Sequence, residues 1–136
     1  MDVRHPRDEL AADDVIGGYE LLRRIGKGGM AEVWVARRAN ARTSKYVAIK
    51  VIAPHLAGQE RYSRMFQAEA ELSAMLNHSN IVQVFEEGED NGISFLVMEW
   101  VEGAAVSQVI EQVGVFPIPI AMEVCRQTAM ALDTAY

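Results

Sequence analysis

A glycine-rich segment between two strand-like runs constrains the fold of this chain more than any other feature. The segment contains Gly26, Gly28 and Gly29. The flanking runs are residues 19–25 and 32–38, and in the second run the valines alternate with other residues, as a pleated strand requires. Glycine reaches backbone conformations closed to other residues and lets the main chain approach a ligand closely. The pattern therefore predicts a β-hairpin whose tip can fold over phosphate groups.

A third strand supplies a cation that could reach such phosphates. Residues 46–52 are rich in β-branched side chains, which favour strands, and Lys50 lies among them. A lysine ammonium binds phosphate as a point charge. Taken alone, the glycines are also compatible with an ordinary hairpin turn, and the lysine with a solvated charge at a sheet edge. The two features together favour a clamp for the phosphates of a nucleotide.

Residues 59–77 form the strongest predicted helix. Its apolar residues recur at near-helical spacing and are expected to face the core: Met65, Phe66, Leu72, Met75 and Leu76. Glu69 lies three residues after Phe66 and three before Leu72, on or beside this face. A carboxylate there needs a basic partner, because an unpaired buried charge is costly. The alternative is that Glu69 edges the solvent face.

The second half of the chain predicts a further hairpin and two helices. Strands are expected at residues 81–87 and 93–101, joined through Asn91-Gly92, the strongest short hairpin signal in the chain. A helix is expected at residues 106–113. Another is expected from near Pro119 to the last residue, without a capping signal before the end, so we expect the chain to stop within a helix. The predicted class is α+β: five antiparallel strands with one helix inserted after the third, then two helices.

Length and composition fit one globular domain, or most of one, with a modest core. The chain has 136 residues, of which 50% are hydrophobic and 24% charged. Residues 1–17 are charged, contain a proline and lack a sustained period, and are expected to be a flexible leader. No apolar run reaches membrane-spanning length and the start of the chain is not signal-like, so a soluble, cytoplasmic protein without a membrane segment is expected.

Charge and cysteine content narrow the possible partners. The net charge of −6 argues against nucleic acid as the main partner. Residues 1–50 contain 10 Lys and Arg against 7 Asp and Glu, whereas residues 51–136 contain 3 against 12, so the glycine-rich end suits an anionic ligand. Cys125 is the only cysteine, which excludes an intramolecular disulfide and favours a reducing compartment. Its apolar, helical setting favours a buried structural thiol over a nucleophile.

Five motifs in a fixed order give the chain a resemblance to a known family. They are G-x-G-x-x-A-x-V from Gly26, V-A-I-K ending at Lys50, F-Q-A-E-A around Glu69, L-N-H-S-N-I-V at the turn after the helix, and V-M-E-W-V-E-G at the end of the last strand. In these motifs the chain resembles the N-terminal lobe of a eukaryotic-type serine/threonine protein kinase of the sort also found in bacteria. The resemblance covers about residues 19–136. It implies an N-lobe with an ATP cleft in residues 18–101, then the hinge exit and the first, incomplete C-lobe helices in residues 102–136.

The resemblance implies a role for each matching residue. The backbone of the glycine loop would cover the ATP phosphates, and Lys50 would bind the α- and β-phosphates while Glu69 holds it in an ion pair. Side chains around the adenine, with Met98 as gatekeeper at the back, and backbone groups of the hinge would hold the base. The ATP-binding residues implied are Ile25, Gly26, Lys27, Gly28, Gly29, Met30, Ala31, Val33, Ala48, Lys50, Met98, Glu99 and Val101.

Five further positions bear on these roles. His78 and Asn80 would anchor the turn after the helix. Ala31 stands where the family has the third glycine of its loop, which keeps the loop compact but can alter its flexibility. Ala104 and Ala105 stand where the resemblance allows a polar ribose contact, so the ribose would rely on backbone or water.

The family's catalytic loop H-R-D and metal motif D-F-G do not occur in this sequence. The chain is therefore expected to position ATP weakly but not to catalyse transfer: no catalytic base is present, no metal site is expected here, and the Mg²⁺ of the full kinase would need ligands from elsewhere. The full protein would transfer the γ-phosphoryl group of ATP to Ser or Thr of a protein substrate. An exposed underside should make the chain prone to aggregation.

Two other functions remain open from the sequence. A pseudokinase or regulatory binding module would share this lobe without chemistry, and the sequence beyond Tyr136 would discriminate, since H-R-D and D-F-G there would favour the enzyme. A dinucleotide-binding enzyme could use G-x-G-x-x-A, but that motif needs a helix directly after the glycines. Here E-V-W-V-A-R alternates like a strand.

Overall fold

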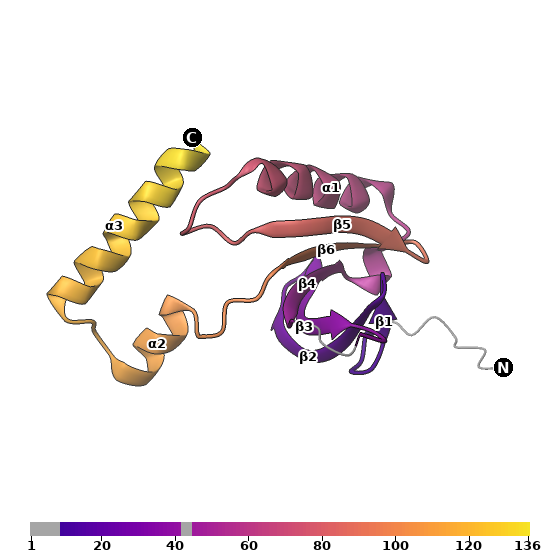
Figure 1. The fold of residues 1–136 in the computed structure, drawn as a ribbon, viewed down its shortest axis with the longest axis horizontal. Coiled ribbons are helices and arrows are strands. Elements are labelled where there is room, and N and C mark those ends of the chain that lie inside the picture. Colours follow the sequence, from indigo (N-terminus) through magenta and orange to yellow (C-terminus); the bar gives the residue numbers. More distant parts are fainter. Residues whose placement is uncertain (1–8, 42–44) are drawn as a thin grey trace.

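A computed structural model describes residues 9–41 and 45–136. Within these residues, six strands form one curled antiparallel sheet in the order β1-β2-β3-β4-β6-β5. Helix α1 lies along β5 and β6, whereas α2 and α3 extend beyond the sheet (Figure 1). The elements are β1 Val15–Ile16, β2 Tyr19–Lys27, β3 Ala31–Arg38, β4 Val47–Ile52, a 3₁₀ turn η1 Pro54–Leu56, α1 Glu60–Met75, β5 Val84–Asp90, β6 Ile93–Glu99, α2 Val106–Val113 and α3 Ile118–Ala135.

The predicted α+β class and the order of the elements are confirmed, but the sheet has one strand more than expected. Val15 and Ile16 pair with Glu20 and Tyr19 of β2 and so form β1 within the predicted leader. The backbone N–H of Gly17 also donates to Asp90 Oδ2 at 2.7 Å, which ties this segment to the β5–β6 hairpin. A strand of two residues is too short to show a period in the sequence. Residues 1–8 of the predicted leader lie outside the described residues.

The sheet separates two apolar cores because side chains alternate along each strand. One core fills the inside of the curl, and it includes Leu21, Trp34, Ile49, Phe95 and Val97. The other lies between the sheet and α1, and it includes Ile52, Leu56, Phe66, Ala70 and Leu96. Strands β4 and β6 have buried residues on both faces, and the alternation along β4 places Lys50 on the same face as Ile52, toward α1.

Helix α1 contacts the sheet through fewer side chains than its sequence pattern predicts. Its buried residues are Phe66 and Ala70. Leu72 and Met75, expected in the core, are 67% and 81% exposed. The strands cover only a narrow stripe of the helix, and the small Ala70 lets it approach the sheet closely.

The C-terminal helices follow the predicted boundaries, but their apolar side chains are uncovered. No residue of α2 or α3 is buried. Cys125 on α3 is exposed, so the expectation of a buried thiol is wrong. The reason is that no described element packs over its face of α3. In the described part of the chain, no helix combines the length and apolar character needed to cross a lipid bilayer.

Both predicted hairpins are present. Asn91 and Gly92 at the tip of the β5–β6 hairpin both have positive φ, 50° and 80°, as a tight two-residue turn requires. The β2–β3 hairpin contains the glycine segment, and the backbone N–H of Gly28 donates to the carbonyl of Ala31 at 2.9 Å to close its tip. The sheet thus carries the glycine tip at the end of β2 and β3, beside the start of α1.

Candidate functional site

Lys50 and Glu69 meet at the face of the sheet that α1 covers. Lys50 lies in β4 and pairs with Val33 of β3 and Leu96 of β6. Its ammonium donates to Glu69 Oε1 at 2.5 Å. The Lys50 side chain is 25% exposed and that of Glu69 is 54% exposed, so the pair is open to an approaching ligand. Glu69 thus has a basic partner, as one sequence interpretation expects, and it also lies at the solvent edge of α1, as the alternative expects.

The glycine hairpin is held over this pair from one side. The backbone N–H of Ala53, just after β4, donates to the carbonyl of Met30 at 2.9 Å. Ala31 and Val33 pair with Ile52 and Lys50, so the second arm of the hairpin is continuous with the strand that carries the lysine. The first arm has a register shift between Arg24 and Gly26 in its pairing with β3. The tip is therefore tied to the chain after β4 at Met30, and its first arm has an irregularity just before Gly26.

A cavity of about 500 Å³ lies between the hairpin, β4 and α1. Its lining includes Gly26 to Ala31, Val33, Lys50 and Glu69, all of which the sequence predicts as site residues. The charged residues of the lining are Lys27, Lys50 and Glu69, a positive balance in a chain whose net charge is −6. An anion is therefore attracted here although the whole chain is acidic.

A second cavity of about 330 Å³ adjoins the first and shares Val33, Lys50 and Glu69 with it. Met98, the predicted gatekeeper, lines this second cavity. The structure thus brings most of the predicted residues together around Lys50. Four predicted residues line neither cavity: Ile25, Ala48, Glu99 and Val101.

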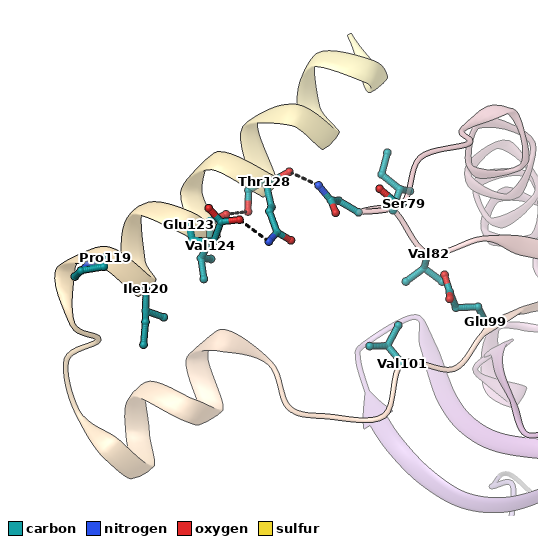
Figure 2. Close-up of a pocket in the computed structure, with 12 residues that line it drawn as sticks. Ser79, Val82, Glu99, Val101, Pro119, Ile120, Glu123, Val124 and Thr128 are labelled. Carbon is teal, nitrogen blue, oxygen red and sulfur yellow. Dashed lines mark hydrogen bonds between the residues drawn. The ribbon is translucent and has the colours of Figure 1, made fainter.

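Glu99 and Val101 instead line a larger cavity of about 730 Å³ between the segment after β6 and α3. Figure 2 shows both side chains across this space from Ile120, Glu123 and Val124 of α3. The roles predicted for Glu99 and Val101 belong to their backbone groups, so these roles stay predictions. We place the candidate site at the 500 Å³ cavity, because a cation lies there beneath the glycine hairpin, whereas no Lys or Arg lines the 730 Å³ cavity.

The turn between α1 and β5 joins the sheet to α3. His78 Nδ1 accepts the backbone N–H of Asn80 at 3.0 Å. The side-chain amide of Asn80 donates to the carbonyl of Gln127 at 3.0 Å (Figure 2). His78 and Asn80 therefore lie as anchors of this turn, as the sequence predicts.

Four residues of the 500 Å³ cavity escaped the sequence prediction: Ile52, Tyr62, Met65 and Phe66. Side-chain periodicity could have found all four of them. Ile52 lies two residues after Lys50 in a strand, and Met65 and Phe66 lie four and three residues before Glu69 in a helix, so each shares a face with a predicted site residue. Tyr62 lies two turns before Glu69.

An anion such as a polyphosphate often binds together with a metal ion, for which the protein can supply ligands. Among residues 9–41 and 45–136, no group of three or more His, Cys, Asp or Glu side chains could hold a metal ion. Cys125, the only cysteine, lies on α3, away from the cavity. The arrangement can hold phosphates by the Lys50 cation and by backbone amides of the hairpin.

Comparisons with known proteins agree on one family. The family model described as protein kinase domain matches residues 19–136. The chain is 34% identical over 118 residues to a probable serine/threonine-protein kinase of Clostridium perfringens, which covers 87% of this chain and 17% of that protein. It is also 34% identical over 127 residues to the serine/threonine-protein kinase PrkC of Bacillus subtilis, covering 93% of this chain and 19% of that protein.

Solved structures agree with the sequence comparisons. A crystal structure of the Mycobacterium tuberculosis PknI kinase domain aligns with a TM-score of 0.75 and 29% identity, covering 93% of this chain and 51% of that domain. The chain therefore spans about half of a solved kinase domain and less than a third of the curated relatives it matches.

Proposed function

This chain belongs to the protein kinase domain family, and from that premise we propose that it forms the ATP-binding part of a serine/threonine protein kinase. One observation carries the proposal. The ammonium of Lys50, held by Glu69 at 2.5 Å, faces a cavity covered by the glycine hairpin. That combination of a fixed cation and a close-approaching backbone is what a polyphosphate needs for binding.

Each part of the proposed site has a physical task. The hairpin backbone from Gly26 to Ala31 would cover the phosphates, because glycine leaves room for close contact. Lys50 would neutralise charge on the α- and β-phosphates. Glu69 would keep the flexible lysine side chain pointing into the cavity, which lowers the entropy lost on binding. Val33 and Met98 would enclose the base, since both line the space next to Lys50.

We propose further that the whole kinase transfers the γ-phosphoryl group of ATP to a Ser or Thr of a protein substrate in the cytoplasm. Mg²⁺ would accompany ATP, and among the described residues no cluster of His, Cys, Asp or Glu side chains could hold it. The sequence has no H-R-D or D-F-G motif, so the 136 residues are expected to bind ATP without catalysing transfer. A pseudokinase role is less favoured, because the Lys50–Glu69 pair is present.

The proposal is tested by replacing Lys50 with methionine and measuring ATP binding by isothermal titration calorimetry. A charged hydrogen bond contributes about 1.5–3 kcal/mol, so ATP affinity should fall by about 10- to 150-fold. The fold should persist, because an ion pair this exposed contributes at most about 1 kcal/mol. The matched control is Arg64→Met. Arg64 is a cation paired with Glu60 at 2.6 Å, both on α1, and neither residue lines the cavity.

Equal ATP affinity of the wild type and the Lys50→Met variant would overturn the proposed site. A similar loss in the Arg64→Met variant would mean that net charge, and not Lys50 itself, controls binding. In the whole kinase, phosphotransfer measured with radiolabelled ATP should be lost in the Lys50→Met variant.

A further inference from the structure

Glu32 is the only charged residue buried among those the structure describes, at 5% exposed. Both of its carboxylate oxygens have partners. Oε2 accepts the indole N–H of Trp34 at 3.2 Å, and Oε1 accepts from Arg24 Nη1 at 3.4 Å. A buried carboxylate is costly unless it is paired and hydrogen-bonded. The position of Glu32 relative to Trp34 and Arg24 is therefore tightly constrained.

The carboxylate lies at the base of the glycine tip. Glu32 pairs with Lys27 across β2 and β3, directly before the turn that the Gly28–Ala31 hydrogen bond closes. The ladder shifts register between Arg24 and Gly26, so Ile25 is an extra residue in β2. A bulge of this kind leaves a residue unpaired and weakens the local ladder. The contact between Glu32 and Arg24 spans this interruption.

Glu32 lies on the face of the sheet opposite to the cavity of the proposed nucleotide. Its neighbours Ala31 and Val33 line the cavity, whereas Glu32 does not. Trp34, on the same face as Glu32, belongs to the core inside the curl of the sheet. Any influence of Glu32 on a ligand must therefore pass through the backbone of the hairpin.

We propose that Glu32 is a positioning residue for the glycine tip. It bonds the start of β3 to the indole of Trp34, a core residue of the same strand, and it bonds to Arg24 on the first arm of the hairpin, beyond the bulge. Together these contacts would fix the position of Gly26 to Ala31 above Lys50. On the second arm, Met30 is tied to Ala53, and Glu32 adds a constraint on the first arm. This inference rests on the proposed binding of ATP at the cavity.

The proposal predicts that loss of Glu32 weakens contact with phosphates and spares contact with the base. The test uses Glu32→Gln, which keeps the shape and one acceptor but loses the charge that holds Arg24. ATP affinity should fall by about 2- to 12-fold, the range of one net hydrogen bond, while adenosine affinity stays the same. The substitution makes the chain less acidic, which by itself would favour ATP, so a loss cannot come from net charge.

A matched control exists on the same hairpin. Glu20 forms an ion pair with Arg37 at 3.5 Å between β2 and β3, and neither residue lines the cavity. Glu20→Gln should leave the ratio of ATP to adenosine affinity at the wild-type value. If Glu32→Gln does not fold, Arg24→Gln and Trp34→Phe carry the same prediction. Arg37→Gln then controls for the charge that Arg24→Gln removes.

The outcomes separate this inference from the proposed function. If the wild type does not bind ATP, or Lys50→Met binds it equally well, the proposed function fails. If the Lys50→Met loss is seen but the Glu32, Arg24 and Trp34 variants keep the wild-type affinity ratio, the positioning role of Glu32 is wrong. An equal loss of ATP and adenosine affinity would also overturn it, because that result indicates a general structural role.

Discussion

Alanine at Gly17 should force the short strand β1 and the ring of Phe95 apart. Gly17 has φ +58°, and an added Cβ would lie 2.2 Å from Phe95 Cζ and 2.6 Å from Cε1. Phe95 is 4% exposed in the core inside the curl, and the ring also lies against Gly88, where a Cβ would come within 2.8 Å. The ring is therefore confined by two glycines and cannot move aside without opening the core.

The expected loss of stability has two parts. A non-glycine residue in the left-handed region costs about 1–2 kcal/mol. Overpacking a core ring costs about 1–3 kcal/mol more. The neighbouring Gly18 isolates the first part, because its φ is +86° but an added Cβ would meet no atom within 4 Å. Gly18→Ala should therefore lose only the backbone part, and Gly17→Ala should be less stable than Gly18→Ala by about 1–3 kcal/mol.

Urea unfolding followed by circular dichroism measures this difference from the two midpoints, provided that the slopes agree. A lower slope for Gly17→Ala would mean that β1 has already detached in the native state. Equal free energies of unfolding for the two variants would refute the reasoning, since they would mean that Phe95 and Gly17 are not in contact. Residues 9–17 would then be the flexible leader that the sequence predicts.

Two further substitutions test the rest of the sheet and its helix. Phe66→Ala should lower the free energy of unfolding by about 3 kcal/mol and weaken ATP binding, because Phe66 is 8% exposed and fixes α1 one turn before Glu69. Leu72→Ala is the control, because its side chain is 67% exposed, and it should change stability by less than about 0.5 kcal/mol in the same urea titration. Equal losses of stability in the two variants would contradict this prediction. Burial, and then the hydrogen bond to Glu86, raise the pKa of Tyr19 above 10.0. The folded state therefore favours the neutral phenol. This contribution to stability is complete below pH 10 and is lost as the pH rises through the higher pKa of the folded state. The stability advantage of the wild type over Tyr19→Phe should therefore shrink between pH 9 and pH 11, measured from urea midpoints, and a constant difference would show that Tyr19 does not titrate with folding.

Local sequence patterns were sufficient for the helices and for every strand except β1. Strand and helix periods depend on near neighbours, so the β2–β3 hairpin, α1 and the Asn91-Gly92 turn could be predicted from residue order alone. The helix pattern predicted a basic partner for Glu69, and the family resemblance implied that this partner is Lys50.

Long-range packing decided the rest. The strand β1 exists because Gly17 bonds to Asp90, 73 residues away, and because Phe95 accepts only a glycine beside its ring. Because the sheet curls, it covers Phe66 and Ala70 of α1 and leaves Leu72 exposed. No described element covers Cys125 of α3. The partners of Glu32 are near in sequence, but its burial is not visible there, because it depends on the core that the closed sheet forms around Trp34. Backbone preferences are local, whereas burial depends on which distant surface arrives, and that is settled only when the sheet closes.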